Sequence, residues 1–145
     1  MPHEMSKQEI LSFLTEAPWT GQVATVRANG RPHVATVWFT VDAGDIVFVT
    51  SSQSVKAKNL RRSPFAAFSV DDDTHPYSYA VVEGPVSTGD DLEQVRAWAM
   101  EIATRYIGLD GARAYTQSDT FPDDLVCRLT PSHLSGVARL ASESD

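Results

Sequence analysis

The most constraining feature of this sequence is a strict alternation of side chains from His33 to Val41. On one side of the alternation every position is apolar: Ala35, Val37, Phe39 and Val41. The other side is mixed: Val34, Thr36, Trp38 and Thr40. A period of two is typical of a half-buried β-strand. Turn signals flank it, with Asn29-Gly30 before it and Asp42-Ala43-Gly44-Asp45 after it, so we expect hairpins on both sides.

Further short strands follow the same pattern. We predict them at Gln22–Arg27, Ile46–Thr50, Phe65–Val70, Tyr77–Val86, Leu125–Leu129 and Leu134–Leu140. Helices are predicted from a capping box at Ser6 to a stop at Pro18, over Ser54–Arg62, and over Asp90–Ile107 with Gly108 as C-cap. Six or seven hairpin-linked strands with few helices predict a mainly β fold, a small antiparallel barrel with helices packed outside.

Length and composition exclude several classes of protein. The chain of 145 residues predicts a single domain spanning 1–145. Its 12 basic and 19 acidic residues give a net charge of -7, which argues against a nucleic-acid partner. Cys127 is the one cysteine, so no internal disulfide or cysteine zinc cluster is expected. No apolar run has membrane-spanning length and no secretory signal is found, so we expect a cytoplasmic protein without a membrane partner.

The sequence does not identify catalytic residues. The histidines are scattered without metal-ligand spacing, so no metal site is predicted: His3, His33, His75 and His133. No nucleophile elbow supports a hydrolase triad.

Four of the twelve basic residues lie within seven positions, at Lys56, Lys58, Arg61 and Arg62. Hydroxyl side chains crowd the preceding residues, where the free amides of a helix start could bind an anion. Two interpretations remain open for this segment. It is either an anion-binding helix or a solvated helix face with Ser54 as N-cap.

Three aromatic residues lie on the less apolar faces of their predicted strands. They are Trp38, Tyr77 and Tyr79. Such rings either stack on a flat ligand or close a subunit interface.

These segments, taken in order, resemble the split β-barrel superfamily of pyridoxamine 5′-phosphate oxidase-like flavin and deazaflavin oxidoreductases. The resemblance runs from about Gln22 to Tyr115. Its motifs are Gly30-Arg31-Pro32-His33 before Val37-Trp38-Phe39, Val47-Phe48-Val49-Thr50, the segment from Ser54 to Pro64, Pro76-Tyr77-Ser78-Tyr79 with Val82-Glu83-Gly84, and Ala103-Thr104-Arg105-Tyr106-Ile107-Gly108.

Within the superfamily the chain is most similar to small enzymes that use the deazaflavin coenzyme F420. Relatives that use FMN often carry an Arg-Lys pair, whereas here Val55 precedes Lys56. The resemblance implies an oxidoreductase that transfers a hydride from reduced F420 to an unsaturated small molecule. The alternatives are an FMN-dependent oxidase or reductase of the same fold, and a non-catalytic protein that binds flavin, deazaflavin or haem.

The resemblance also implies a homodimer with the cofactor at the subunit interface. The residues that it implies for cofactor binding are Val37, Trp38, Phe39, Thr50, Ser51, Ser54, Lys56, Ala57, Asn59, Arg61, Tyr77 and Tyr79. Tyr77 and Tyr79 would come from the partner subunit. Arg61 and Arg62 would serve the anionic glutamate tail of F420.

Overall fold

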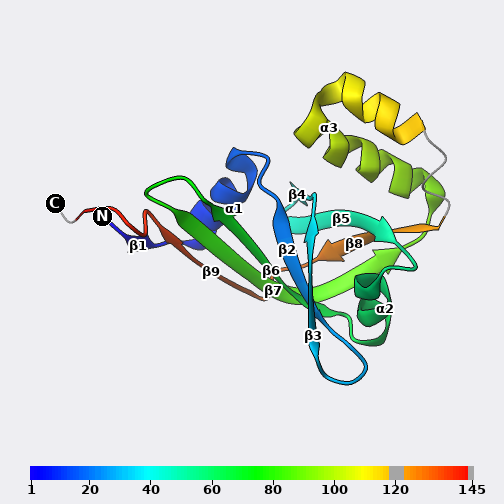
Figure 1. Ribbon diagram of the computed structural model, residues 1–145, viewed down its shortest axis with the longest axis horizontal. Coiled ribbons are helices and arrows are strands. Elements are labelled where there is room, and N and C mark those ends of the chain that lie inside the picture. Colours follow the sequence, from blue (N-terminus) through cyan, green and yellow to red (C-terminus); the bar gives the residue numbers. More distant parts are fainter. Residues whose placement is uncertain (118–122, 144–145) are drawn as a thin grey trace.

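A computed structural model describes residues 1–117 and 123–143 and consists of a curled antiparallel sheet with three helices outside it (Figure 1). The strands are β1 (His3–Glu4), β2 (Gly21–Val26), β3 (Pro32–Val37), β4 (Thr40–Asp42), β5 (Asp45–Ser51), β6 (Phe65–Asp72), β7 (Ser78–Gly89), β8 (Asp124–Leu129) and β9 (His133–Ala138). The helices are α1 (Lys7–Glu16), α2 (Val55–Arg62) and α3 (Leu92–Gln117). The prediction of a mainly β, barrel-like fold is confirmed.

The strands form one hydrogen-bonded sheet, and within the described residues its two ends are not paired with each other. Its hydrogen-bonded order is β3-β2-β6-β7-β8-β5-β4, with β9 paired to β7 and β1 paired to β9. The strands β3 and β4 therefore lie at the two ends of the order, although they follow each other in sequence. We call the gap between β3 and the β4–β5 hairpin the seam.

The single strand predicted from His33 to Val41 is wrong, because the structure forms two strands there. β3 ends at Val37 and β4 begins at Thr40. Between them, the backbone of Phe39 bonds to side chains of α3 instead of to a strand. Its N–H donates to the Tyr106 hydroxyl at 3.1 Å, and its carbonyl accepts from Arg105 at 2.8 Å. The predicted alternation still holds, since Val37 and Phe39 are buried while their neighbours face out.

The helix predictions are confirmed at the N-terminus and incomplete at the C-terminal end. Ser6 and Glu9 form the expected capping box at the start of α1. Ser54 caps α2 by accepting a hydrogen bond from the Ala57 N–H at 3.1 Å. Gly108 has a φ of 76°, as expected of a C-cap, but the chain then continues as a second helical segment over residues 109–117. This segment was not predicted.

The core lies inside the curl of the sheet. Its largest fully buried side chains include Phe39, Phe48 and Phe68, and each such side chain contributes about 1.5–3 kcal/mol by burial. A second, smaller cluster joins α3 to the outer face of β5 and β8, where Val95 and Ala99 pack on Val49 and Val126. The helix α3 is therefore held against the strand that borders the seam.

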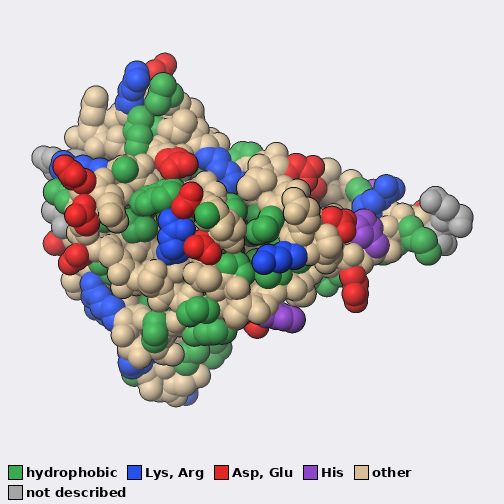
Figure 2. Space-filling model, turned by 180° about the vertical axis from the view of Figure 1, so that it is seen from behind, with side chains coloured by type: hydrophobic (Ala, Val, Ile, Leu, Met, Phe, Trp, Pro, Cys, Tyr) green, Lys and Arg blue, Asp and Glu red, His purple; other side chains and the backbone are tan. Residues whose placement is uncertain are grey.

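The surface carries mixed charge on the face opposite to the view of Figure 1. Figure 2 shows Lys and Arg side chains interspersed there with Asp and Glu and with apolar side chains. In the described part of the chain, no helix is long and apolar enough to cross a membrane.

Candidate functional site

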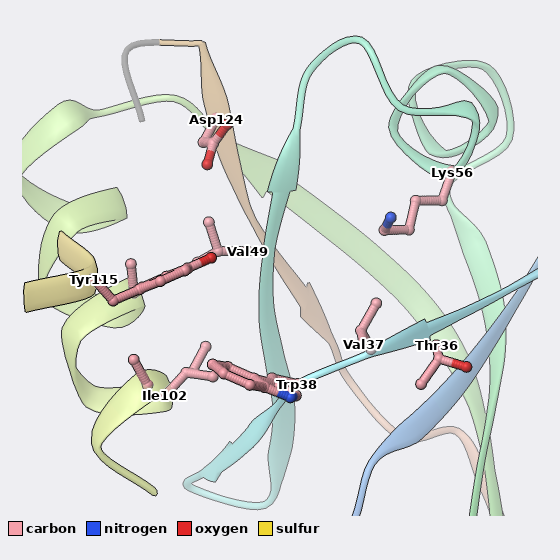
Figure 3. Close-up of a pocket in the computed structure, with 10 residues that line it drawn as sticks. Thr36, Val37, Trp38, Val49, Lys56, Ile102, Tyr115 and Asp124 are labelled. Atoms are coloured by element: carbon pink, nitrogen blue, oxygen red, sulfur yellow. The ribbon is translucent and has the colours of Figure 1, made fainter. Parts of the chain in front are cut away.

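A cavity of about 450 Å³ opens in the seam (Figure 3). Its walls come from β3, β5, α2, α3 and the start of β8. The residues that line it are Thr36, Val37, Trp38, Val49, Lys56, Ala99, Ile102, Ala103, Tyr115 and Asp124. Three of the predicted cofactor residues meet here: Val37, Trp38 and Lys56.

Trp38 forms an aromatic wall that α3 holds in place. Its indole stacks on the Tyr106 ring, with centroids 4.9 Å apart and planes 8° apart, and the Tyr115 ring lies 6.1 Å away. The Tyr106 hydroxyl donates to the Trp19 carbonyl at 2.6 Å. Arg105 donates to the carbonyls of Leu14, Ala17 and Phe39 at 2.6 to 2.8 Å. The side chain of Trp38 is therefore oriented by a network that spans three elements.

Lys56 supplies positive charge to the cavity. Figure 3 shows its side chain extending from α2 toward the cavity, above Val37. The ion pairs among the described residues are His3–Glu9 and Arg128 with Asp42 and Asp45, so Lys56 has no acidic partner there. Burial lowers the pKa of Lys56. A half-buried cation without a counterion is a suitable group for an anionic ligand.

The start of α2 offers backbone donors beside Lys56. Ser54 caps the Ala57 N–H, and the Lys58 N–H bonds to the Ser54 carbonyl. Neither arrangement uses the first two amides of the helix, those of Val55 and Lys56, which have no intrahelical acceptor. Such amides bind phosphate readily.

Strand alternation separates Thr50 from Ser51. Thr50 faces the core, 7% exposed, and its hydroxyl donates to the Ser54 hydroxyl at 3.1 Å. Ser51 is exposed, pairs across the sheet with Asp124, and accepts a hydrogen bond from the Gln53 N–H. Ser51 therefore lies on the same side of β5 as Val49 but is not among the residues that line the cavity, whereas Thr50 braces the helix cap.

Four other residues that were predicted to bind the cofactor pack in the core or form hydrogen bonds within the protein. Phe39 and Ala57 are fully buried in the core. Asn59 is buried and donates to the Thr25 hydroxyl at 3.0 Å. Arg61 donates to the Ser52 carbonyl at 3.1 Å. None of these four side chains lines the cavity.

A second groove, of about 350 Å³, lies on another side of α2. It is lined by Arg27, Ala28, Asn29, Val55, Lys58, Asn59 and Arg62. Arg62 links the end of β2 to α2 across this groove, since its guanidinium bonds to the Val26 carbonyl and to the Asn59 side chain. We call this the basic groove. Val55 faces it, and not the cavity that holds Lys56.

The two predicted tyrosines lie outside the cavity of their own chain. Tyr77, directly before β7, and Tyr79, its second residue, are 43% and 37% exposed. The segment that follows α2 meets β7 further along, where the Val86 N–H bonds to the Pro64 carbonyl. The prediction that a partner subunit contributes these tyrosines stays a prediction.

Sequence analysis did not identify the residues with which α3 and β8 line the cavity. Tyr115 reaches the cavity because the chain turns at Gly108 and folds back, and Asp124 reaches it as the first residue of β8. Burial and the neighbouring Asp123 raise the pKa of Asp124. By contrast, Cys127 is enclosed in the core, where burial raises the pKa of its thiol to about 12, as expected for an inert cysteine. No group of three or more potential metal ligands occurs in residues 1–117 and 123–143.

The sequence of this chain was compared with known protein families and proteins. The model of the pyridoxamine 5′-phosphate oxidase family matches residues 6–138. The F420H2-dependent biliverdin reductase of Mycobacterium tuberculosis is 33% identical over 100 residues, which cover 68% of this chain and 70% of that protein.

Two solved structures share the fold at similar identity. A conserved hypothetical protein from Mycobacterium tuberculosis has a TM-score of 0.77 at 28% identity, covering 90% of this chain and 84% of that one. A structure described as an F420 reductase has a TM-score of 0.72 at 29% identity, covering 85% of this chain and 94% of that one.

Proposed function

This chain belongs to the pyridoxamine 5′-phosphate oxidase family, and on that premise we propose that it is an F420-dependent reductase of an unsaturated small molecule. The observation that carries the proposal is the seam cavity, in which Lys56 and the free amides of α2 adjoin an aromatic and apolar slot. The 33% identity to an F420H2-dependent biliverdin reductase supports the choice of cofactor and reaction type.

The residues present fit a deazaflavin with a phosphate. Lys56 and the first amides of α2 would hold the phosphate, with Ser51 beside them. Val37 and Trp38 would border the flat ring. When bound and reduced, F420 supplies the hydride. The protein binds and orients the reactants and excludes water, which is why the sequence shows no acid–base pair.

The basic groove supports F420 over FMN. An internal phosphodiester carries one charge, which suits a single Lys56, and the glutamate tail of F420 continues outward with further carboxylates. Lys58, Arg27 and Arg62 line a groove on the same helix that would receive this tail. FMN ends at its phosphate and would leave these cations unused.

A homodimer would complete the site. The outer face of β3, β2, β6 and β7 exposes large apolar side chains, namely Val34, Val26, Phe65 and Tyr79. Exposed large apolar side chains on one face of a sheet, interspersed with polar ones, are typical of an interface between subunits. A second copy on this face would bury it and bring Tyr77 and Tyr79 toward the cofactor.

The decisive experiment is a parallel titration of the apoprotein, prepared in a host that lacks F420, with F420 and with FMN. We expect F420 with its glutamate tail to bind at least about ten-fold tighter, a difference of roughly 1.4 kcal/mol. Reduced F420 should then be oxidised in the presence of an enone, a quinone or biliverdin. Tighter binding of FMN at every salt concentration would replace this proposal with an FMN-dependent enzyme. Binding without any turnover would indicate a cofactor-binding protein.

A further inference from the structure

The part of the seam cavity next to α3 contains the carboxyl group of Asp124. Asp124 lines the cavity, and no hydrogen bond or ion pair reaches its carboxyl from residues 1–117 and 123–143. Figure 3 shows Asp124 and Val49 on one side of β5, with Lys56 on the other side. The cation and the carboxyl group therefore do not neutralise each other. A partly buried carboxylate without a donor is unfavourable, and a ligand that donates a hydrogen bond would offset this cost.

The surroundings of Asp124 restrict the shape of such a ligand. Trp38 and Tyr115 present two rings with planes 47° apart, at 36% and 49% exposure. Ile102 and Ala103 form a buried apolar floor on α3. These walls suit a flat, conjugated molecule. An uncharged N–H on such a molecule would satisfy the carboxylate without adding a second charge that must be desolvated.

We propose that this part of the cavity binds the substrate, and that Asp124 selects planar conjugated compounds with an N–H group by accepting the N–H hydrogen bond. The inference rests on the proposed function, because it assigns the Lys56 side of the cavity to the cofactor. It names a substrate class and a specificity-determining residue that the sequence did not indicate.

The test uses two planar compounds that differ in one N–H: isatin and N-methylisatin. Both are titrated calorimetrically into the wild-type protein, Asp124→Ala and the neighbouring control Asp123→Asn. Loss of one hydrogen bond to a charged group should cost the wild type roughly ten-fold in affinity for N-methylisatin. Asp124→Ala should bind both compounds equally, and Asp123→Asn should keep the preference for isatin.

Several results would overturn the inference. They are equal affinity of the wild type for both compounds, no measurable binding of either, or a preference that persists in Asp124→Ala. If Asp124→Ala does not fold, Asp124→Asn replaces it, and a preference as large as that of the wild type counts against the inference.

Titration with and without saturating F420 separates this inference from the proposed function. If F420 does not bind but the apoprotein prefers isatin through Asp124, the cofactor assignment fails and the N–H recognition stands. If F420 binds and Asp124→Ala leaves the preference unchanged, the cofactor assignment stands and the role of Asp124 is wrong.

Discussion

The indole of Trp38, the residue that follows the end of β3, lies flat on the ring of Tyr106 in α3. The two rings are 4.9 Å apart and within 8° of parallel. Because Tyr106 also bonds to the backbone of Phe39 and Trp19, the cavity wall and the break between β3 and β4 have one common support. The geometry of the site therefore depends on α3, which holds both features.

Tyr106→Phe should destabilise the protein by about 1–3 kcal/mol, because the buried N–H of Phe39 loses its acceptor while the ring stack remains. Urea denaturation measures the change in the free energy of unfolding. Thr15→Ala is a suitable control, since Thr15 is exposed and its hydroxyl bonds to carbonyls of its own helix. A loss no larger than that of the control would show that the hydroxyl does not support the Phe39 backbone.

Lys56→Ala should weaken binding of both F420 and FMN by roughly ten- to a hundred-fold, the effect of losing one charge-assisted hydrogen bond worth about 1.5–3 kcal/mol. The apoprotein should lose little stability, because burial already disfavours the charged form of this lysine. Fluorescence titration and thermal unfolding measure the two effects. Unchanged affinity for both cofactors would remove Lys56 from the phosphate site.

Features of this site that depend on residues nearby in the sequence were predicted better than those that depend on residues far along the chain. Ser54 as N-cap, Gly108 at positive φ and the inward side of Phe39 all depend on neighbouring residues, and all are confirmed. The break after Val37 depends on Arg105 and Tyr106, which lie more than 60 residues away. No local pattern could reveal it.

The same dependence on contacts outside the local sequence explains why several predicted cofactor residues do not line the cavity. Listing Thr50 and Ser51 together ignored the alternation of β5, which turns Thr50 into the core. Likewise, no local pattern singled out Asp124, and only the register with Ser51 brings it beside the cavity. Sequence spacing predicted most of the strands but joined β3 and β4, and the packing of α3 against the sheet determines which side chains meet.

Lys58→Ala should weaken F420 binding in proportion to the length of its glutamate tail and leave FMN binding unchanged. Lys58 lines the basic groove and does not line the cavity of Lys56. Contacts of this exposed kind are worth only about 0–1 kcal/mol each, and salt screens them. The difference between wild type and variant should therefore shrink as salt rises. Equal weakening of FMN would instead place Lys58 at the phosphate.

The protein should be a dimer in solution at micromolar concentration. Obligate dimers bury about 2,000 Å² or more, and the exposed face with Val34, Phe65 and Tyr79 offers apolar surface for this. Light scattering should give twice the chain mass of 15.9 kDa. Phe65→Asp should shift the protein toward monomer and weaken F420 binding at the same time. A wild-type mass of 15.9 kDa would refute the dimer and the shared site.

Asp124→Asn should make the apoprotein more stable at pH 7 but not at low pH. Burial raises the pKa of Asp124 above its value in the unfolded chain, so the folded state binds this proton more tightly. Stability contributed by the protonated form is present below the pKa of the unfolded chain, about 3.9, and is lost as pH rises through the folded pKa. An asparagine has no proton to lose, so its advantage should grow across this window and then stay constant. Asp73→Asn, in the exposed loop before β7, makes the same change in net charge and serves as the control. Thermal unfolding of the three proteins between pH 3 and pH 7 measures the effect. A wild type that gains stability relative to Asp124→Asn as pH rises would mean that the carboxylate has a favourable partner in the folded chain.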